Sequence, residues 1–297
     1  MNKKITELQN PNSLRLDSLP TNQIIKLIND EDSKISLLIK ENIPKISELV
    51  NETVKNIKNG GRLIYVGAGT SGRLGVLDAS ECPPTFSVSS KLVVGIIAGG
   101  AKALQQSIEG AEDDFKLAIN DLKKNKINKK DTIIGITTSG TTPYVNKFLK
   151  EAKKIGSFTA IITSNKLKKE NWIDIKIECV VGPEIITGST RMKAGTATKM
   201  ILNMISTTVM IKLNKVYKNL MVDLKISNDK LLKRAIRIIT SLTDLNKEES
   251  KRLLKNAKGE VKTALLMYLN KKNYKQAKTL LSKTKGNLRQ ALKEKNE

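Results

Sequence analysis

Histidine is absent from this 297-residue chain, and this absence excludes more chemistry than any other feature of the composition. Without an imidazole there is no Ser-His-Asp triad, no Cys-His dyad and no histidine-ligated zinc site. Proton transfer near neutral pH must therefore be carried out by Asp, Glu, Lys, Tyr or Cys.

Cysteines and long apolar runs are also scarce. The two cysteines, Cys82 and Cys179, have no metal-ligand spacing and give no sign of a disulfide framework. No apolar run approaches the roughly 20 residues that a membrane-spanning helix needs. Met1 is followed by polar, lysine-containing sequence and not by the apolar core of a signal peptide. We therefore expect a cytoplasmic protein without a membrane partner.

Positive charge is plentiful, but arginine and aromatic side chains are not. The formal net charge is +24, yet only eight of the 53 basic residues are arginine, and aromatic residues make up 3% of the chain. Proteins that read nucleic acids usually rely on arginine forks and stacked aromatic rings. We therefore expect a lysine-coated solvated surface and no nucleic-acid partner. Such a surface would still attract a phosphorylated substrate.

The most informative stretch runs from Gly61 to Phe86. A β-rich apolar run, Leu63 to Val66, is followed by Gly67-Ala-Gly-Thr-Ser-Gly72 and then by a helical segment. A glycine turn between a strand and a helix presents backbone N–H groups to an anion, most often a phosphate. The turn matches neither a complete dinucleotide fingerprint nor a Walker A loop. After the helix we expect Ser80-Glu81-Cys82-Pro83-Pro84, with the two prolines holding Glu81 rigidly.

Further strand signals alternate with helices, which predicts an open parallel α/β sheet. They cover residues 92–97, 131–137, 158–163 and 175–181. Thr138-Ser-Gly-Thr-Thr-Pro143 follows the third strand, and Gly182 to Gly195 leads into a long helix from Thr196 to about Leu213. One hydroxyl-rich turn is ordinary helix capping. Two such turns at the carboxyl ends of strands indicate one ligand crevice.

The rest of the chain is predicted to be helical. We assign residues 1–54 to an N-terminal arm and helices, 55–218 to the sheet domain and 219–297 to a small C-terminal helical domain. The helices before the sheet begin at Thr21, and Pro44 kinks the second one. In the tail, residues 247–265 align with residues 274–292 at an offset of 27 residues. Each copy is a helix, a Lys-Gly stop and a second helix, which predicts a small bundle.

Several of these segments resemble the N-acetylmuramic acid 6-phosphate etherase family. They are Gly67 to Phe86, Glu109 to Asp114, Thr138 to Val145, Gly182 to Asn203 and Asn219 to Asp223. The resemblance covers nearly the whole chain and implies a sugar isomerase (SIS) fold, a homodimer, a sugar-phosphate substrate and no metal or organic cofactor. It also implies removal of D-lactate from N-acetylmuramic acid 6-phosphate by ring opening, C2 deprotonation, expulsion of lactate from C3 and addition of water. The products are N-acetylglucosamine 6-phosphate and D-lactate.

Two glutamates carry the chemistry that the resemblance implies. Glu81 protonates the departing lactate, and Glu112 takes the companion acid–base role, which includes removal of the C2 proton. Burial would raise the pKa of such a carboxyl toward the working pH. The acidic segment around Glu112 also has a simpler interpretation, in which its charges complement the dipole of a following helix.

The candidate binding residues lie in the three Ser/Thr-containing turns. The predicted phosphate cradle consists of Gly69, Ser71, Ser139, Gly140 and Thr142 with the adjacent N–H groups. Candidates for the sugar or the lactyl carboxylate are Ser189, Arg191 and Lys193, and structural pairing at a subunit contact is the alternative for the two cations. Thr141 and Thr198 depart from the Arg and Gln that are common in the family.

Two other functions share these features. A non-catalytic sugar-phosphate-binding regulator of the SIS fold, such as the glucokinase regulatory protein, would have the same turns. An aldose–ketose isomerase would use similar proton chemistry but would not release lactate. No helix-turn-helix signature precedes the sheet, which argues against a transcription regulator. The presence of both Glu81 and Glu112 favours an enzyme.

Overall fold

The computed structural model describes residues 4–226 and 228–294. They form two compact units, one from the described residues of Met1–Ser80 and Ser90–Ser206, the other from those of Glu81–Ser89 and Thr207–Glu297. Helices α4 (Gly69–Phe86) and α7 (Lys193–Lys212) each begin in the first unit and end in the second. No helix among the described residues combines the length and the apolar character that crossing a membrane requires.

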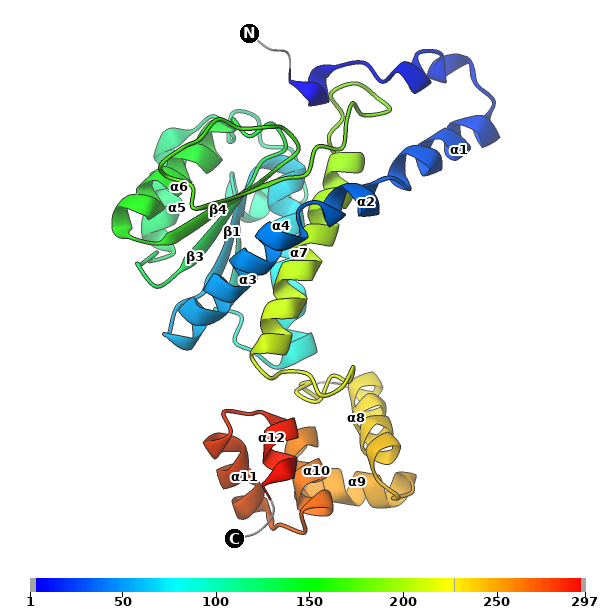
Figure 1. The fold of residues 1–297 in the computed structure, drawn as a ribbon, viewed down its shortest axis with the longest axis vertical. Coiled ribbons are helices and arrows are strands. Elements are labelled where there is room, and N and C mark those ends of the chain that lie inside the picture. Colours follow the sequence, from blue (N-terminus) through cyan, green and yellow to red (C-terminus); the bar gives the residue numbers. More distant parts are fainter. Residues whose placement is uncertain (1–3, 227, 295–297) are drawn as a thin grey trace. The chain divides into compact units, whose positions relative to one another are not determined.

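The first unit is built on a five-stranded parallel sheet with the order β2-β1-β3-β4-β5 (Figure 1). Its strands are β1 (Leu63–Gly67), β2 (Val93–Ile97), β3 (Thr132–Ile136), β4 (Phe158–Thr163) and β5 (Ile175–Glu178). β1 and β3 are buried along their whole length, as expected for strands that helices cover on both faces. The predicted strands are confirmed, although β5 ends three residues earlier than expected.

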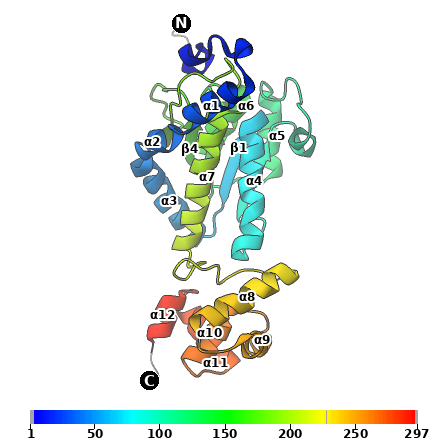
Figure 2. The same cartoon turned by 90° about the vertical axis from the view of Figure 1, so that its right-hand side faces the viewer.

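Helices cover both faces of this sheet. On one face α6 (Pro143–Ile155) packs against β1, β3 and β4, and α5 (Phe115–Lys124) packs against α6. α3 (Ile43–Lys58), α4 and α7 lie on the opposite face (Figure 1 and Figure 2). Glycines permit close packing on both faces. A Cβ on Gly135 would lie 2.7 Å from Val145 of α6, and one on Gly75 of α4 would lie 3.0 Å from Tyr65.

The chain before β1 is a series of short elements. The 3-10 turns are Ile5–Glu7, Pro11–Ser13 and Leu16–Ser18, and the helices are α1 (Thr21–Asp32), α2 (Ile35–Lys40) and α3. A further 3-10 turn, Gly100–Leu104, follows β2. The prediction of one helix kinked at Pro44 is wrong, because α2 ends at Lys40 and α3 begins at Ile43. Proline lacks the N–H that a helix interior needs and suits the first turn of a new helix.

The described residues of the second unit form five complete helices, which lie as follows around the predicted repeat. They are α8 (Asp229–Leu242), α9 (Lys247–Asn256), α10 (Val261–Leu269), α11 (Tyr274–Lys283) and α12 (Leu288–Lys293). Asn246 and Asn273, 27 residues apart, each begin a copy with a capping box. Each copy then turns at a Lys-Gly pair in the left-handed region, with φ of +54° and +82° in the first and +51° and +75° in the second. Equivalent residues of the two copies, such as Leu254 and Leu281, share one core.

Candidate active site

β1 and β3 lie side by side, but the chain leaves them in opposite directions. α4 follows β1, lies on one face of the sheet and leads to β2. α6 follows β3, lies on the opposite face and leads to β4. Open parallel sheets bind ligands outside the carboxyl ends of the strands at such a reversal. β1 and β3 end together, with Gly67 paired to Ile136. The two predicted Ser/Thr turns therefore begin at neighbouring positions on one edge of the sheet.

The turn between β1 and α4 is shorter than the sequence suggests. Only Ala68 lies between the end of β1 at Gly67 and the start of α4 at Gly69. A Cβ on Gly67 would lie 2.6 Å from the nitrogen of Gly72, and one on Gly72 would lie 2.8 Å from the oxygen of Gly67. Gly69 is exposed with φ of +51°, and Ser71 is half-buried in the first turn of α4. The first N–H groups of this 18-residue helix form a favourable end for an anion.

Hydroxyl groups line the turn between β3 and α6. Thr137 Oγ1 lies 2.7 Å from Thr142 Oγ1 and 3.4 Å from Ser139 Oγ. Ser139 Oγ lies 3.2 Å from Thr141 Oγ1 and accepts the N–H of Thr141 at the same distance. Gly140, with φ of +73°, allows the chain to turn back toward α6. A chain of hydroxyls ahead of a helix N-terminus suits the oxygens of a phosphate.

The acidic segment lines a cavity of about 290 Å³ beside the first turn. Glu109 and Glu112 line it together with Gly69 at the start of α4. The backbone N–H of Tyr144, in the first turn of α6, donates to the carbonyl of Glu112 at 2.9 Å. Glu112 is therefore held next to both predicted phosphate turns. Asp114 instead caps the N-terminus of α5, so for this residue the acidic charge complements the dipole of the following helix.

Arg73, in the second turn of α4, holds the chain just before the acidic segment. Its guanidinium donates to the carbonyl of Gln106 at 2.9 Å and to that of Leu104 at 3.3 Å. Arg73 also lines the same cavity as Glu112. The sequence did not single out Arg73, because an arginine in the second turn of a helix has no distinctive pattern.

Glu81 lies inside α4 and not after it, so that prediction is wrong. The helix continues through Pro83 and Pro84 to Phe86, because the fixed φ of proline is helical and the missing hydrogen bonds fall near the helix end. Glu81 belongs to the second unit and Glu112 to the first. Their convergence on one substrate stays a prediction. Both side chains are exposed, so the expected burial of a catalytic carboxyl is not found in the single chain.

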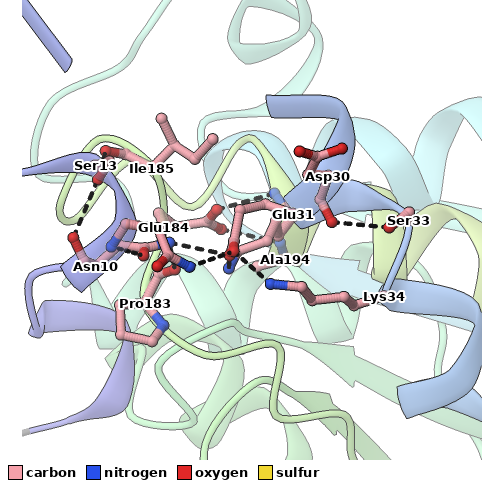
Figure 3. Close-up of polar contacts among 12 residues, drawn as sticks. Asn10, Ser13, Asp30, Glu31, Ser33, Lys34, Pro183, Glu184, Ile185 and Ala194 are labelled. Carbon is pink, nitrogen blue, oxygen red and sulfur yellow. Dashed lines mark hydrogen bonds and ion pairs between the residues drawn. The ribbon is translucent and has the colours of Figure 1, made fainter. Parts of the chain in front are cut away.

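The loop between β5 and α7 is fixed by a buried polar network (Figure 3). The ammonium of Lys193 lies 2.5 Å from the carboxylate of Glu31 in α1, and both side chains are buried. Asn10 donates to Glu31 at 3.0 Å and to the carbonyl of Pro183 at 3.2 Å. Glu184 accepts the first two backbone N–H groups of α7, both at 3.0 Å. The network joins the N-terminal segment to both ends of the loop.

This network sets the charge of its two carboxyls in different ways. Burial opposes ionisation of Glu31, but hydrogen bonds from Lys193, Lys34, Asn12 and Asn10 outweigh it and lower the pKa of Glu31 to about 2. Burial raises the pKa of Glu184, and the two N–H groups of α7 act against that rise. Glu31 is thus the fixed anion that balances Lys193.

The three residues predicted to bind the sugar or the lactyl carboxylate, Ser189, Arg191 and Lys193, therefore differ in their surroundings. Lys193 is buried against Glu31 of the same chain, which favours a structural role over a substrate contact, although the pair lies within one chain and not at the expected subunit contact. Ser189 is half-buried, and Arg191 is exposed two residues before the start of α7. Both stay candidates for the sugar or the lactyl carboxylate.

A larger cavity, of about 830 Å³, lies in the second unit. Seven lysines line it, namely Lys215, Lys225, Lys251, Lys255, Lys258, Lys262 and Lys278. None of the predicted site residues is among the described residues around it. The ammonium of Lys262 already donates to three acceptors within the unit, the carboxylate of Asp223 at 2.8 Å and two backbone carbonyls. The N-terminus of α10 lines this cavity, but none of the five strands of the sheet ends there. We therefore place the candidate site at the strand ends of the first unit, beside the smaller cavity.

Comparisons with known proteins decide the family. Residues 45–153 match the family model of the glucokinase regulatory protein N-terminal SIS domain, and residues 218–259 match that of the C-terminal lid domain of the glucokinase regulatory protein. The N-acetylmuramic acid 6-phosphate etherase of Clostridium beijerinckii is 50% identical over 97% of this chain and 95% of its own length. That of Photorhabdus laumondii is 48% identical over 98% and 97%. The chain belongs to the N-acetylmuramic acid 6-phosphate etherase family.

The resemblance inferred from the motifs is thereby confirmed, as is the SIS-type fold of this etherase-family chain. Among solved structures, a phosphoheptose isomerase from Francisella tularensis matches 65% of this chain and 100% of its own, with a TM-score of 0.47 and 14% identity. Three residues that the sequence motifs did not indicate also contribute to the arrangement around the candidate site. They are Glu31, Arg73 and Thr137. Glu31 and Arg73 contact residues outside their own helices, and Thr137, directly after β3, contacts the hydroxyls of Ser139 and Thr142.

Proposed function

We propose that this protein is a carbon–oxygen lyase that cleaves the D-lactyl ether bond of N-acetylmuramic acid 6-phosphate. The products are N-acetylglucosamine 6-phosphate and D-lactate, and the reaction serves the recycling of cell-wall amino sugars. The observation that carries this proposal is the identity of about half of all residues, along nearly the full chain, with proteins named for the etherase activity. The regulatory alternative is less favoured, because the glucokinase regulatory protein models match only parts of the chain.

The phosphate group binds between the two Ser/Thr turns. Its oxygens accept from the hydroxyl of Ser71, from N–H groups after Gly69, and from Ser139, Thr142 and the turn at Gly140. The position of both turns at the ends of adjacent strands supports this role. So does the hydroxyl chain that runs from Ser139 to Thr142 through Thr137. Ser189 and Arg191 then bind the sugar or the lactyl carboxylate.

The two glutamates transfer the protons. In the open-chain aldehyde, Glu112 removes the proton from C2, and the released electron pair forms the C2=C3 double bond while the C3–O bond breaks. Glu81 gives a proton to the leaving oxygen, which departs as the hydroxyl of D-lactate. Water then adds to C3, its proton passes to Glu81, and Glu112 returns a proton to C2. These steps need only acid–base groups, and a chain without histidine supplies them as carboxyls.

We further infer a cytoplasmic homodimer that binds neither nucleic acid nor membrane. Sugar phosphates are charged and stay inside the cell that makes them, which supports the location. The family resemblance supports the dimer, and the scarcity of arginine and aromatic residues supports the absence of a nucleic-acid partner. The division into residues 1–54, 55–218 and 219–297 stays a prediction.

A lactate-release assay with N-acetylmuramic acid 6-phosphate tests the function. We expect lactate and N-acetylglucosamine 6-phosphate in equal amounts, and a fall in kcat of about 10² to 10⁴-fold for Glu81→Gln and for Glu112→Gln. Glu48→Gln, which alters an exposed ion pair on α3, is the control and should retain activity. Folded wild-type protein that interconverts sugar phosphates without releasing lactate would be an isomerase. Full activity in both glutamine variants would remove the proposed acid and base.

A further inference from the structure

The N-terminal arm, residues 4–19, lies along the strand ends that form the candidate site. The backbone N–H of Ile5 donates to Asn165 Oδ1 at 3.0 Å. Asn165 Nδ2 donates to Thr6 Oγ1 at 3.2 Å and to the carbonyl of Thr138 at 2.9 Å. Thr6 and Asn165 are only 1% and 6% exposed. Asn165 thus ties the start of the arm to the Ser/Thr turn after β3.

A second set of contacts holds the arm against the loop before α7. Asn10 bonds the carbonyl of Pro183 and the buried carboxylate of Glu31. The hydroxyl of Ser13 donates to the carbonyl of Ile185 at 2.7 Å. Figure 3 shows Asn10 and Ser13 directed toward this loop, and Figure 1 shows the arm in dark blue beside it. The arm is therefore fixed at two points, and Lys4 lies at its end over the Ser/Thr turn.

The ammonium of Lys4 donates to Thr141 Oγ1 in that turn. None of the ion pairs among the residues that the structure describes includes Lys4. Within the described part of the chain, its positive charge is thus held at the turn without a carboxylate at ion-pair distance. The same turn presents the hydroxyls of Ser139 and Thr142 at the N-terminus of α6. Thr142, at the cap position, makes no side-chain capping bond.

We propose that Lys4 is a phosphate-binding residue of the substrate site, carried there by the N-terminal arm. An ammonium group supplies the charge that hydroxyls and N–H groups lack, and charge-assisted hydrogen bonds to phosphate are stronger than neutral ones. The arm positions this cation, because Ile5 and Thr6 are fixed directly after Lys4 and Asn10 is fixed further along the arm. The inference rests on the proposed function and adds one binding residue to its phosphate turn.

Steady-state kinetics of Lys4→Met test the role of the charge. We expect KM for N-acetylmuramic acid 6-phosphate to rise about tenfold while kcat stays within about twofold, since a contact made equally in ground and transition states changes only binding. Lys4→Arg keeps the charge and should recover most of the loss. Lys45→Met, at an exposed ion pair on α3, is the matched control. An unchanged KM, or a fall in kcat alone, would overturn the proposal.

Binding of inorganic phosphate separates this inference from the proposed reaction. We expect inorganic phosphate to raise the Tm of the wild-type protein, compared with chloride at equal ionic strength, and to raise that of Lys4→Met much less. Thr6→Val removes the hydroxyl that Asn165 bonds and should weaken phosphate binding in the same direction. If wild-type protein releases no lactate, the proposed function fails, and the phosphate experiment still decides the role of Lys4. Equal phosphate protection of wild type and Lys4→Met would overturn it.

Discussion

Single residues hold the candidate site in place, and the buried pair of Glu31 and Lys193 is the clearest case. The carboxylate of Glu31 is paired with the ammonium of Lys193 and accepts hydrogen bonds from two asparagines. An ammonium left without its partner in such a place is costly, because burial removes the water that would solvate it. The pair therefore fixes the position of α7 and of the loop that carries Ser189 and Arg191.

Stability against urea at different pH values tests this pair. The pKa of Glu31 falls from its ordinary 4.5 to about 2 in the folded protein, so its contribution is fully present above pH 4.5 and is lost as the pH falls through about 2. We predict that Glu31→Gln lowers the free energy of unfolding at pH 7 by about 3 kcal/mol. The difference from wild type should shrink between pH 4.5 and 2.

The exposed Glu48→Gln is the control for this measurement, because its carboxylate lies at the surface beside Lys45. Surface ion pairs contribute about 0–1 kcal/mol, and we expect little change at any pH. A destabilisation by Glu31→Gln that stays constant from pH 7 to pH 2 would contradict the assignment of the low pKa to Glu31.

At the scale of whole elements, short and long connections build the site in different ways. The turns after β1 and β3 are short, and the strand and helix on either side fix them. The connection between β2 and α5 runs from Ala98 to Asp114 and contains only one 3-10 turn. Its position depends on contacts from elsewhere, which include the guanidinium of Arg73 and the backbone N–H of Tyr144.

Loss of the Arg73 contacts should loosen that connection without unfolding the sheet. For Arg73→Ala we predict about tenfold faster amide hydrogen exchange in residues 104–112 and a fall in kcat/KM of similar size. Exchange in β1 should be unchanged, and Arg73→Lys should be intermediate because it retains one donor group. Hydrogen-exchange mass spectrometry makes the measurement, with Arg289→Ala in the second unit as control. Lower activity with unchanged exchange would instead mean that Arg73 contacts the substrate.

At the scale of the whole molecule, the charge of +24 affects how an anionic substrate arrives. A positive surface attracts a phosphorylated sugar, and dissolved salt screens this attraction. The Debye screening length falls from about 14 Å at 50 mM to about 4 Å at 500 mM ionic strength. We predict that this increase in salt lowers kcat/KM several-fold, while kcat at saturating substrate changes little. A parallel series with sucrose at matched viscosity is the control. A kcat/KM that does not depend on salt would show that surface charge plays no part in binding.

Much of the fold could be predicted because its signals are local. The five strands follow apolar runs, and the repeat follows Lys-Gly pairs 27 residues apart. The glycines at positions 67 and 72 mark a turn in which the backbone leaves no room for a side chain. Helix boundaries near proline do not follow from local sequence alone. Pro44 lies in the first turn of a new helix, whereas Pro83 and Pro84 lie near the end of one, and the surrounding packing decides between these outcomes.

The sequence by itself determined the sheet, the two Ser/Thr turns, the helical repeat and the family, because each depends on residues that are neighbours in the chain. Only the tertiary structure decided that Lys193 faces Glu31, that Lys4 reaches Thr141 and that Asn165 holds the arm. These partners are between 137 and 162 residues apart. Polar contacts over such separations have no periodicity in the sequence, since folding alone brings the two groups together.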